Sequence, residues 1–281
     1  MSAQRLLFIH IPKTAGSSMK DVLARQYGAG LRDVHDEEAR IQRQNVQRIL
    51  DLPDDQQARI GCIVGHMPYG LHEYLKGAWA YSVILRHPLK RMVSNYQHVQ
   101  HSARGYPARN LSFEAYAQRA GNDSIQIRYL LGMMRPDTLR VDRETPLPPD
   151  ALERAKAALR TQYAAFGLTE RFDESMLLFA QAFGWQMPLY LRQNVGTPSR
   201  QPISAESLAA VTAMLPVEMA LYEYARTLFE ERIAAYQGDL SADLTRYQQA
   251  NQRLMQADAL RTLPYRTARS VYRKVKKLTR K

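Results

Sequence analysis

The sequence predicts an α/β fold of three layers, in which a central parallel sheet is flanked by helices, followed by a helical C-terminal extension. Four short apolar runs, rich in β-branched and aromatic residues, each lead into a polar turn. Helical patterns, with apolar residues three and four positions apart, follow these turns. Apolar strands that alternate with helices are typical of a parallel sheet that is covered on both faces.

The expected elements follow in order along the chain. Strands are expected at residues 6–10, 60–64, 81–85 and 164–168. Helices are expected at residues 19–27, 89–100, 113–120, 173–183 and 217–236. The chain after Pro202 is expected to be all-helical, with Ser204 as an N-cap. Residues 135–150 carry four prolines, which predicts an irregular connection. Gly238 is expected to end the last packed helix, which divides the chain into a domain at 1–237 and a helical, basic extension at 238–281.

The composition excludes several classes of protein. Of the 281 residues, 45% are hydrophobic and 23% are charged, as in an ordinary globular chain and unlike a disordered one. The single cysteine, Cys62, excludes an intrachain disulfide and a thiolate metal cluster. No apolar run approaches the roughly 18–20 residues that span a bilayer, and the first apolar stretch is too short for a secretory signal. We therefore expect a cytoplasmic protein.

The net charge of +12 is concentrated at the C-terminal end. Residues 265–281 hold eight basic and no acidic residues, and the other 31 basic residues exceed the 27 acidic ones by only four. So small a charge on the body does not call for nucleic acid as a partner. Apolar residues recur mostly three and four apart within 265–281, as in an amphipathic helix. Such a helix suits an anionic membrane surface, for a cytoplasmic protein the inner membrane surface, or a polyanionic glycan. The alternative is a solvated terminus that aids solubility.

The first expected strand leads into a loop suited to an anion. Residues 12–18 read Pro-Lys-Thr-Ala-Gly-Ser-Ser, and small residues let successive N–H groups converge at a helix N-terminus. Lys13 adds a positive charge, and three hydroxyls add donors. The lysine precedes the glycine, so the loop differs from the one that binds nucleoside triphosphates. The pattern favours a phosphate site over a plain strand–helix turn with a solvated lysine.

The second strand leads into a histidine, His66, which lies between a glycine and a Pro-containing turn. An imidazole that titrates near pH 6.5 can take a proton from a hydroxyl at neutral pH. Taken alone, His66 fits a capping or buried structural histidine at least as well. Its place at the end of a strand keeps the catalytic interpretation open.

The third strand leads into Arg86, and Ser94 follows about two helical turns later. A guanidinium and a hydroxyl can hold one phosphate together. The alternative is a structural ion pair for Arg86 and a surface position for Ser94. Ligands of open α/β sheets bind outside the carboxyl ends of the strands, and three such ends carry Lys13, His66 and Arg86. This coincidence favours one shared site.

Two of these loops resemble the cofactor loops of sulfotransferases, which use 3′-phosphoadenosine 5′-phosphosulfate (PAPS). They are residues 10–18, His-Ile-Pro-Lys-Thr-Ala-Gly-Ser-Ser, and residues 85–96, Leu-Arg-His-Pro-Leu-Lys-Arg-Met-Val-Ser-Asn-Tyr. The chain most resembles the carbohydrate branch, which includes heparan sulfate 6-O- and 2-O-sulfotransferases and bacterial relatives. Shorter matches lie at 65–66, 122–132, 166–171 and 222–225, and together they span most of residues 5–230. The resemblance implies a P-loop-like fold.

The resemblance also implies roles for single residues. Those that would hold the 5′-phosphosulfate are Lys13, Thr14, Ala15, Gly16, Ser17 and Ser18. Arg86 and Ser94 would hold the 3′-phosphate, and His66 would be the general base. Thr197 and Arg200 are weaker candidates for further contacts with the cofactor. His87 stands where relatives often have an acidic residue, and the membrane anchor of the Golgi relatives is absent.

The expected function is transfer of a sulfuryl group from PAPS to a hydroxyl of a glycan. In this reaction His66 takes the hydroxyl proton and Lys13 stabilises charge on the leaving phosphate. No metal is expected, because a sulfuryl group carries less negative charge than a phosphoryl group. One alternative is a small-molecule or nucleoside kinase, which would need a full triphosphate loop and a Mg²⁺ carboxylate. The other is a non-catalytic module that binds PAPS or polyanions.

Overall fold

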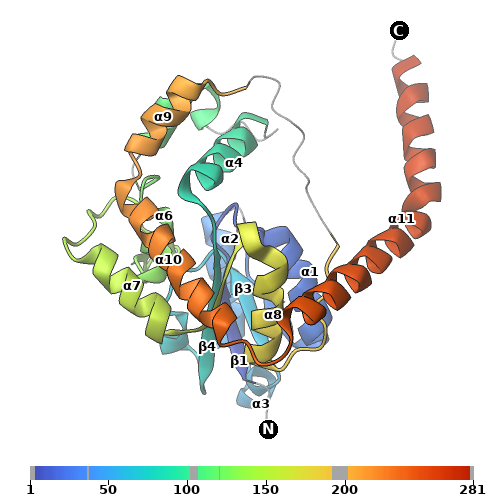
Figure 1. Cartoon of the computed structure of the whole chain (residues 1–281), viewed down its shortest axis with the longest axis horizontal. Helices are drawn as coiled ribbons and strands as arrows, with labels where there is room; N and C mark the ends of the chain where they lie inside the picture. The colour runs from blue at the N-terminus through green and yellow to red at the C-terminus, as the bar shows by residue number, and fades with distance from the viewer. Residues whose placement is uncertain (1–3, 37, 102–106, 120, 192–201, 279–281) are drawn as a thin grey trace.

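The computed structural model describes residues 4–36, 38–101, 107–119, 121–191 and 202–278. Its centre is a five-stranded parallel sheet in the order β2-β3-β1-β4-β7 (Figure 1). The strands are β1 Arg5–Ile9, β2 Leu31–Asp33, β3 Cys62–Gly65, β4 Trp79–Leu85 and β7 Tyr163–Leu168. The four predicted strands are confirmed with small shifts at their ends, and β2 was not predicted. Because the strands are parallel, their carboxyl ends meet at one edge.

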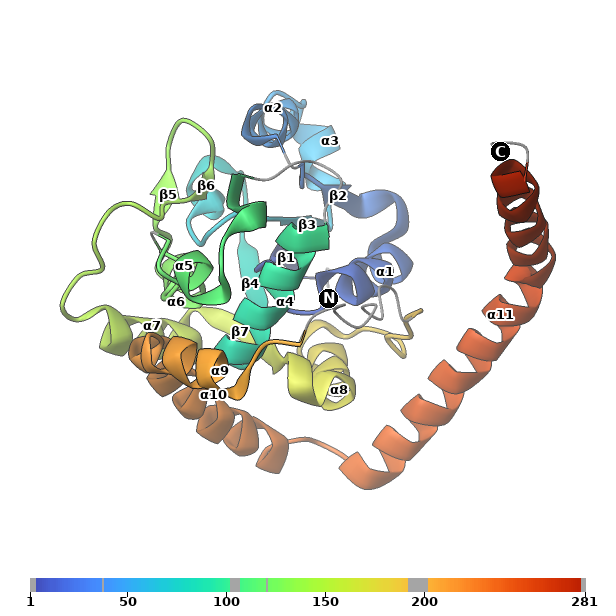
Figure 2. The ribbon, with the colours of Figure 1, turned by 90° about the horizontal axis from the view of Figure 1, so that it is seen from above.

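Side chains that alternate along β1 divide the core into two layers. Leu6 and Phe8 face one side of the sheet, and Leu7 and Ile9 face the other. The first side is covered by α1 Gly16–Tyr27, α8 Phe172–Phe183 and the beginning of α11 Leu240–Leu278. The second side is covered by α2 Ala39–Leu50, α6 Ile125–Leu130, α7 Ala151–Thr161 and α10 Pro216–Ala234. Figure 2 shows the sheet between these two groups of helices, which confirms the predicted three-layer α/β fold.

A third apolar cluster lies beyond the sheet. It joins α4 Pro88–His101, α5 Phe113–Ala117 and α9 Ala205–Ala213. Ser204 begins α9 by accepting a hydrogen bond from the Ser207 N–H at 3.1 Å. Helix α4, which follows β4, is therefore held by α5 and α9 as well as by its connection to the sheet.

The predicted helices are confirmed, with α5 ending at Ala117 rather than at residue 120. Helix α9 confirms the helix that was expected to begin at Ser204. Helices α2, α6 and α7, and the short α3 Asp54–Ala58, were not predicted. The segment 135–150 is not wholly irregular, because β5 Met134–Arg135 and β6 Arg140–Val141 pair antiparallel at its beginning. In the described part of the chain, no helix combines the length and apolarity that crossing a membrane requires.

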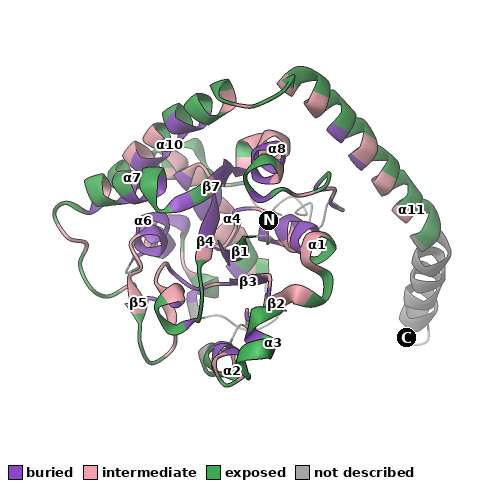
Figure 3. Ribbon diagram, turned by 90° about the horizontal axis from the view of Figure 1, so that it is seen from below, coloured by how far each residue is buried: buried purple, intermediate pink, exposed green. Residues whose placement is uncertain are grey.

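The C-terminal extension is helical, as predicted, but its first turns are part of the packed body. Tyr247 is fully buried, and its hydroxyl donates to the Pro188 carbonyl at 3.1 Å. Asn251 is also buried and accepts a hydrogen bond from the Tyr190 N–H at 2.8 Å. Gly238 follows the end of α10, the helix predicted at 217–236, but α10 is not the last packed helix, because α11 also packs on the body. Figure 3 shows α11 leaving the body beyond this contact.

Candidate functional site at the carboxyl ends of the strands

The loop between β1 and α1 is held in an uncommon conformation. Lys13 and Ala15 have left-handed backbone angles, with φ of 71° and 65°, which cost on the order of 1–3 kcal/mol each for residues with a Cβ atom. Thr14 between them is buried, and its hydroxyl donates to the Ile11 carbonyl at 2.9 Å. The Thr14 hydroxyl proton thus stabilises the loop. Main-chain N–H groups in such a loop, together with those of the first helical turn, form a concave anion site.

Gly16 is required by a close approach of His10. A Cβ atom added at Gly16 would lie 1.5 Å from Nε2 of the His10 ring, so any larger residue would displace that ring or the loop. Ser17 is half-buried and Ser18 is buried in the same turn of α1. The small residues of this loop therefore allow the backbone to lie directly over the end of β1.

Arg86 connects the third strand exit to this loop. Its Nη1 donates to the Lys13 carbonyl at 2.9 Å. Its Nε is buried and has no hydrogen-bond partner among the described residues, and a buried donor without a partner costs roughly 1–3 kcal/mol. The two predicted phosphate-binding residues, 73 positions apart in sequence, thus lie side by side, with one donor unmet.

The two positive charges are close together and are not neutralised by a carboxylate in direct contact. Burial, together with the Arg86 charge, lowers the pKa of Lys13. Burial lowers the pKa of Arg86, and the nearby Glu170 opposes this. Among the described residues, neither cation forms an ion pair within 4.0 Å. Half-buried cations in this arrangement favour an anionic ligand between the strand exits.

Helix α4 places Ser94 and His98 on the same side, because they are four residues apart. The Lys13 charge contributes to lowering the pKa of His98, after burial, so this part of α4 lies near the β1 loop. Within the described ranges, the half-buried Ser94 side chain makes no hydrogen bond. Its hydroxyl is available to a ligand, but the structure places no direct contact between Ser94 and Arg86.

His66 lies at the end of β3, beside the end of β1, because Gly65 pairs with Ile9. The distance from its Nδ1 to the His10 carbonyl oxygen is 2.5 Å. A carbonyl can only accept, so Nδ1 carries the proton in the neutral ring and Nε2 has the free lone pair. Burial, with a smaller contribution from the charge of His35, lowers the pKa of His66 to about 3. The ring is therefore neutral at pH 7 and has an unprotonated Nε2.

His35 is a neighbour of His66 that sequence reasoning missed. The ring centroids of His35 and His66 are 4.2 Å apart, and those of His10 and His66 are 4.3 Å apart. His35 reaches this place because β2 pairs with β3, an element that was not predicted. Burial lowers the pKa of His35, and burial lowers that of His10 well below its usual value. Three uncharged imidazoles therefore meet at the ends of β1, β2 and β3.

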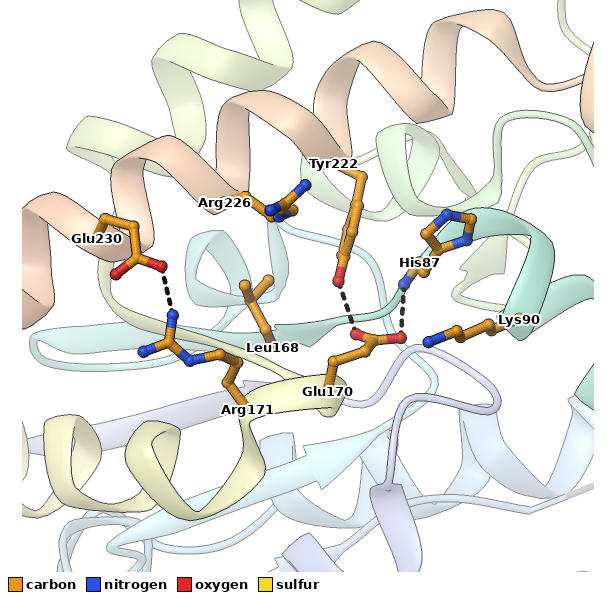
Figure 4. Close-up of a pocket in the computed structure, with 8 residues that line it drawn as sticks. All are labelled: His87, Lys90, Leu168, Glu170, Arg171, Tyr222, Arg226 and Glu230. Carbon is orange, nitrogen blue, oxygen red and sulfur yellow. Dashed lines mark hydrogen bonds and ion pairs between the residues drawn. The ribbon is translucent and has the colours of Figure 1, made fainter. Parts of the chain in front are cut away.

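A cavity of about 300 Å³ lies at the ends of β4 and β7 (Figure 4). Two of its lining residues, Glu170 and Tyr222, oppose the effect of burial on the pKa of Arg86. Glu170 is at the centre of the cavity: one carboxylate oxygen accepts from the His87 N–H at 3.2 Å, and the other accepts from the Tyr222 hydroxyl at 2.8 Å. Arg171 pairs with Glu230 at the far end of the cavity. The basic groups Lys90 and Arg226 also line it. The cavity thus extends the site from Arg86 towards α10.

His87 lies beside Glu170 and Tyr222. Its main-chain N–H donates to Glu170, and its ring lies edge-on to Tyr222, with the centroids 5.4 Å apart. Burial lowers the pKa of His87, while Glu170 opposes this. Among the described residues, the buried Nδ1 of His87 has no hydrogen-bond partner.

Two predicted site residues, Thr197 and Arg200, lie outside the described residues. Over the ranges that the structure describes, no group of three or more His, Cys, Asp or Glu side chains is arranged to hold a metal ion. Lys13, Arg86 and His66 are all found at neighbouring strand exits, so the structure brings together the three positions singled out in the sequence.

Residues 2–135 match the model of a family described as the sulfotransferase family. This segment contains β1 to β4 and α4, and with them Lys13, His66, Arg86 and Ser94. No curated protein matches the chain.

Proposed function

We propose that the chain, whose residues 2–135 match the sulfotransferase family, transfers a sulfuryl group from PAPS to a hydroxyl of a carbohydrate. The family match supports sulfuryl transfer in general. The donor, the acceptor class and the residues that act are the proposal. The observation that carries it is the pair of half-buried cations, Lys13 and Arg86, next to a neutral histidine at the neighbouring strand exit.

The cation pair supports an anionic donor at the strand exits. We propose that the β1 loop and Lys13 hold the 5′-phosphosulfate, and that Arg86 and Ser94 hold the 3′-phosphate. The unmet Nε donor of Arg86 and the free Ser94 hydroxyl fit such an anion chemically. PAPS supplies the activated sulfuryl group. The loop N–H groups and Lys13 stabilise the charge that develops on the phosphate as that group leaves.

The tautomer of His66 supports its role as general base. Its Nδ1–H is directed to the His10 carbonyl, which fixes the ring and leaves Nε2 to take the proton of the acceptor hydroxyl. The burial that keeps His66 neutral also opposes the imidazolium that forms when it takes a proton. The negative charge of the donor, held at the neighbouring loop, offsets this cost.

A carbohydrate acceptor is supported by the resemblance of the two loops to those of the carbohydrate branch. A sugar hydroxyl is a weak acid, so its attack requires a base at the strand exits, the place where His66 lies. The basic segment 265–281 is proposed to hold the protein near an anionic surface or glycan without taking part in the chemistry.

A comparison of two donors, PAPS and ATP, tests the proposal. The protein is incubated with PAPS or with ATP and Mg²⁺, each with a panel of neutral and acidic glycans, and release of the nucleotide product is measured. We expect glycan-dependent release of 3′-phosphoadenosine 5′-phosphate (PAP) and no glycan-dependent formation of ADP. Glycan-dependent ADP formation would support a kinase instead. If the protein binds PAP but produces no PAP from PAPS with any glycan of the panel, a non-catalytic binding module would be favoured.

A further inference from the structure

Helix α6 contains a buried glutamine, Gln126, that the proposed reaction does not use. It is 1% exposed and lies within the 122–132 segment. Its side-chain amide contacts both main-chain groups of Arg86: Oε1 accepts from the Arg86 N–H at 2.9 Å, and Nε2 donates to the Arg86 carbonyl at 3.0 Å. Since β4 ends at Leu85, Gln126 takes the place that a neighbouring strand would have in pairing with Arg86.

Gln126 is itself held by a buried charge from another element. Its main-chain N–H donates to Oε1 of Glu218 on α10, and its Nε2 lies 3.3 Å from Oε2 of the same carboxylate. Glu218 is fully buried, and Nη2 of the buried Arg91 lies 3.8 Å from its Oε2. Burying such a pair seldom adds net stability, whereas it can fix a single geometry. The orientation of the Gln126 amide on α6 is thus fixed by Glu218 on α10, which in turn lies beside Arg91 on α4.

What this arrangement orients is the guanidinium that joins the two anion-binding segments. The two hydrogen bonds with Gln126, which we call the clamp, hold the main chain of Arg86. The side chain of Arg86 extends from there, and its Nη1 donates to the Lys13 carbonyl. A binding residue must be held within about 0.5 Å and 10–20° of its productive geometry. A change of the main-chain angle at Arg86 is magnified along its long side chain, so control of the main chain controls the position of the charge.

We infer that Gln126 is a positioning residue, which sets Arg86 in the orientation that binds the 3′-phosphate of the donor. The inference rests on the proposed function, because that function assigns the 3′-phosphate to Arg86. It predicts that Gln126 affects ligands with a 3′-phosphate and leaves unaffected those without one. A residue that merely stabilised the fold would affect both or neither.

The test compares the affinities for PAP and for adenosine 5′-phosphate, which lacks the 3′-phosphate, by calorimetric titration. Gln126→Met keeps the side-chain volume close to that of glutamine and removes the clamp. Gln57→Met is the matched control, because Gln57 is a buried glutamine whose Nε2 donates to the carbonyls of Leu50 and Leu52, at 3.0 and 3.2 Å. Gln126→Leu, which also removes both contacts with Arg86 and brings no second carboxylate beside Glu218, is the second variant if the first fails to fold.

We expect Gln126→Met to weaken PAP binding about tenfold or more, since a misplacement of about 1 Å can cost up to about 10²-fold, and to leave adenosine 5′-phosphate binding unchanged. Gln57→Met should change neither affinity. In an Arg86→Ala background, Gln126→Met should have no further effect on PAP binding. Wild-type preference for PAP that survives both Gln126 variants would overturn the inference alone. A wild-type protein that binds both nucleotides equally would overturn the assignment of the 3′-phosphate to Arg86, and with it the proposed function of that residue.

Discussion

Replacing His66 by asparagine separates the base from the fold. The asparagine amide can place an N–H close to where His66 has Nδ1, so the hydrogen bond to the His10 carbonyl at 2.5 Å can be kept. An alanine would leave that carbonyl without its partner, at a cost of about 1–3 kcal/mol. Asparagine has no group at the position of Nε2, which is the atom assigned to the proton transfer. The substitution therefore removes the base and little else.

The expected loss follows from the role of a general base. Such a group contributes about 10²–10⁴ in rate, which corresponds to roughly 3–5 kcal/mol in the activation barrier. His66→Asn should lower kcat by at least about a hundredfold, while the affinity for PAP, measured by titration, stays within about twofold. His72→Ala is the control, because His72 is a half-buried histidine that bonds to the Tyr81 hydroxyl at 2.9 Å, outside the site. Turnover by His66→Asn within about tenfold of the wild type would refute the assignment of the base.

The pH dependence gives a second measure of the same residue. A pKa of about 3 for His66 means that the base stays unprotonated, so kcat/KM should show no acid decline due to His66 between pH 8 and 5. Stability behaves differently, because the unfolded chain takes up a proton near pH 6.5 that the folded one refuses. Folded stability is thus lost as pH falls below about 6.5, by at most about 1.4 kcal/mol per pH unit from this group. Urea unfolding at pH 7 and pH 5 should show that the free energy of unfolding falls less between these pH values in His66→Asn than in the wild type. Equal losses in the two proteins would contradict the lowered pKa of His66.

Three further predictions concern other parts of the molecule. Lys13→Ala should lower kcat by about 10²–10³-fold through loss of charge stabilisation, whereas Lys156→Ala, at an exposed ion pair, should not; equal activities of the two variants would exclude Lys13 from the chemistry. Glu218→Ala leaves Arg91 buried without its carboxylate and should lower the free energy of unfolding in urea by about 3–5 kcal/mol, and a loss below 1 kcal/mol would show that the pair is not held as described. Deleting residues 265–281 should reduce binding to anionic vesicles or polymeric glycan at low salt, with the difference shrinking as salt rises, and should leave turnover on a short acceptor unchanged; equal binding by both chains would contradict a docking role for this segment.

The parts of the fold that local pattern determines could be predicted from the sequence. Strands β1, β3, β4 and β7 are mainly apolar runs in the sequence. The polar residues at their carboxyl ends can therefore be identified from the sequence alone. Helix α7 was missed because its buried positions are mostly alanine, including Ala155 and Ala158, which hides the apolar stripe. Strand β2 was missed because it has only three residues and exists through its pairing with β3. Such pairing is a property of the folded chain.

The same division applies to the site. Lys13, His66 and Arg86 could be found because each follows a strand of a parallel sheet, and the geometry of such sheets brings these ends together. His35 could not, because its place depends on β2. The clamp on Arg86 could not either, because Gln126 lies 40 positions away in sequence. The packing of Tyr247 and Asn251 against the body beside α8 could not be predicted either, because nothing local indicates the partner of these residues.

The most direct test of the account is whether the purified chain forms a sulfate ester. The protein is incubated with PAPS and a panel of glycans and of non-carbohydrate alcohols and phenols, and the acceptors are examined by mass spectrometry beside a reaction with His66→Asn. The account predicts a glycan that gains a sulfuryl group at the expense of PAPS with the wild type, and a rate at least about a hundredfold lower with the variant. Sulfation at equal rates by both proteins, or PAPS that stays intact with every carbohydrate while a non-carbohydrate hydroxyl is sulfated, would contradict it.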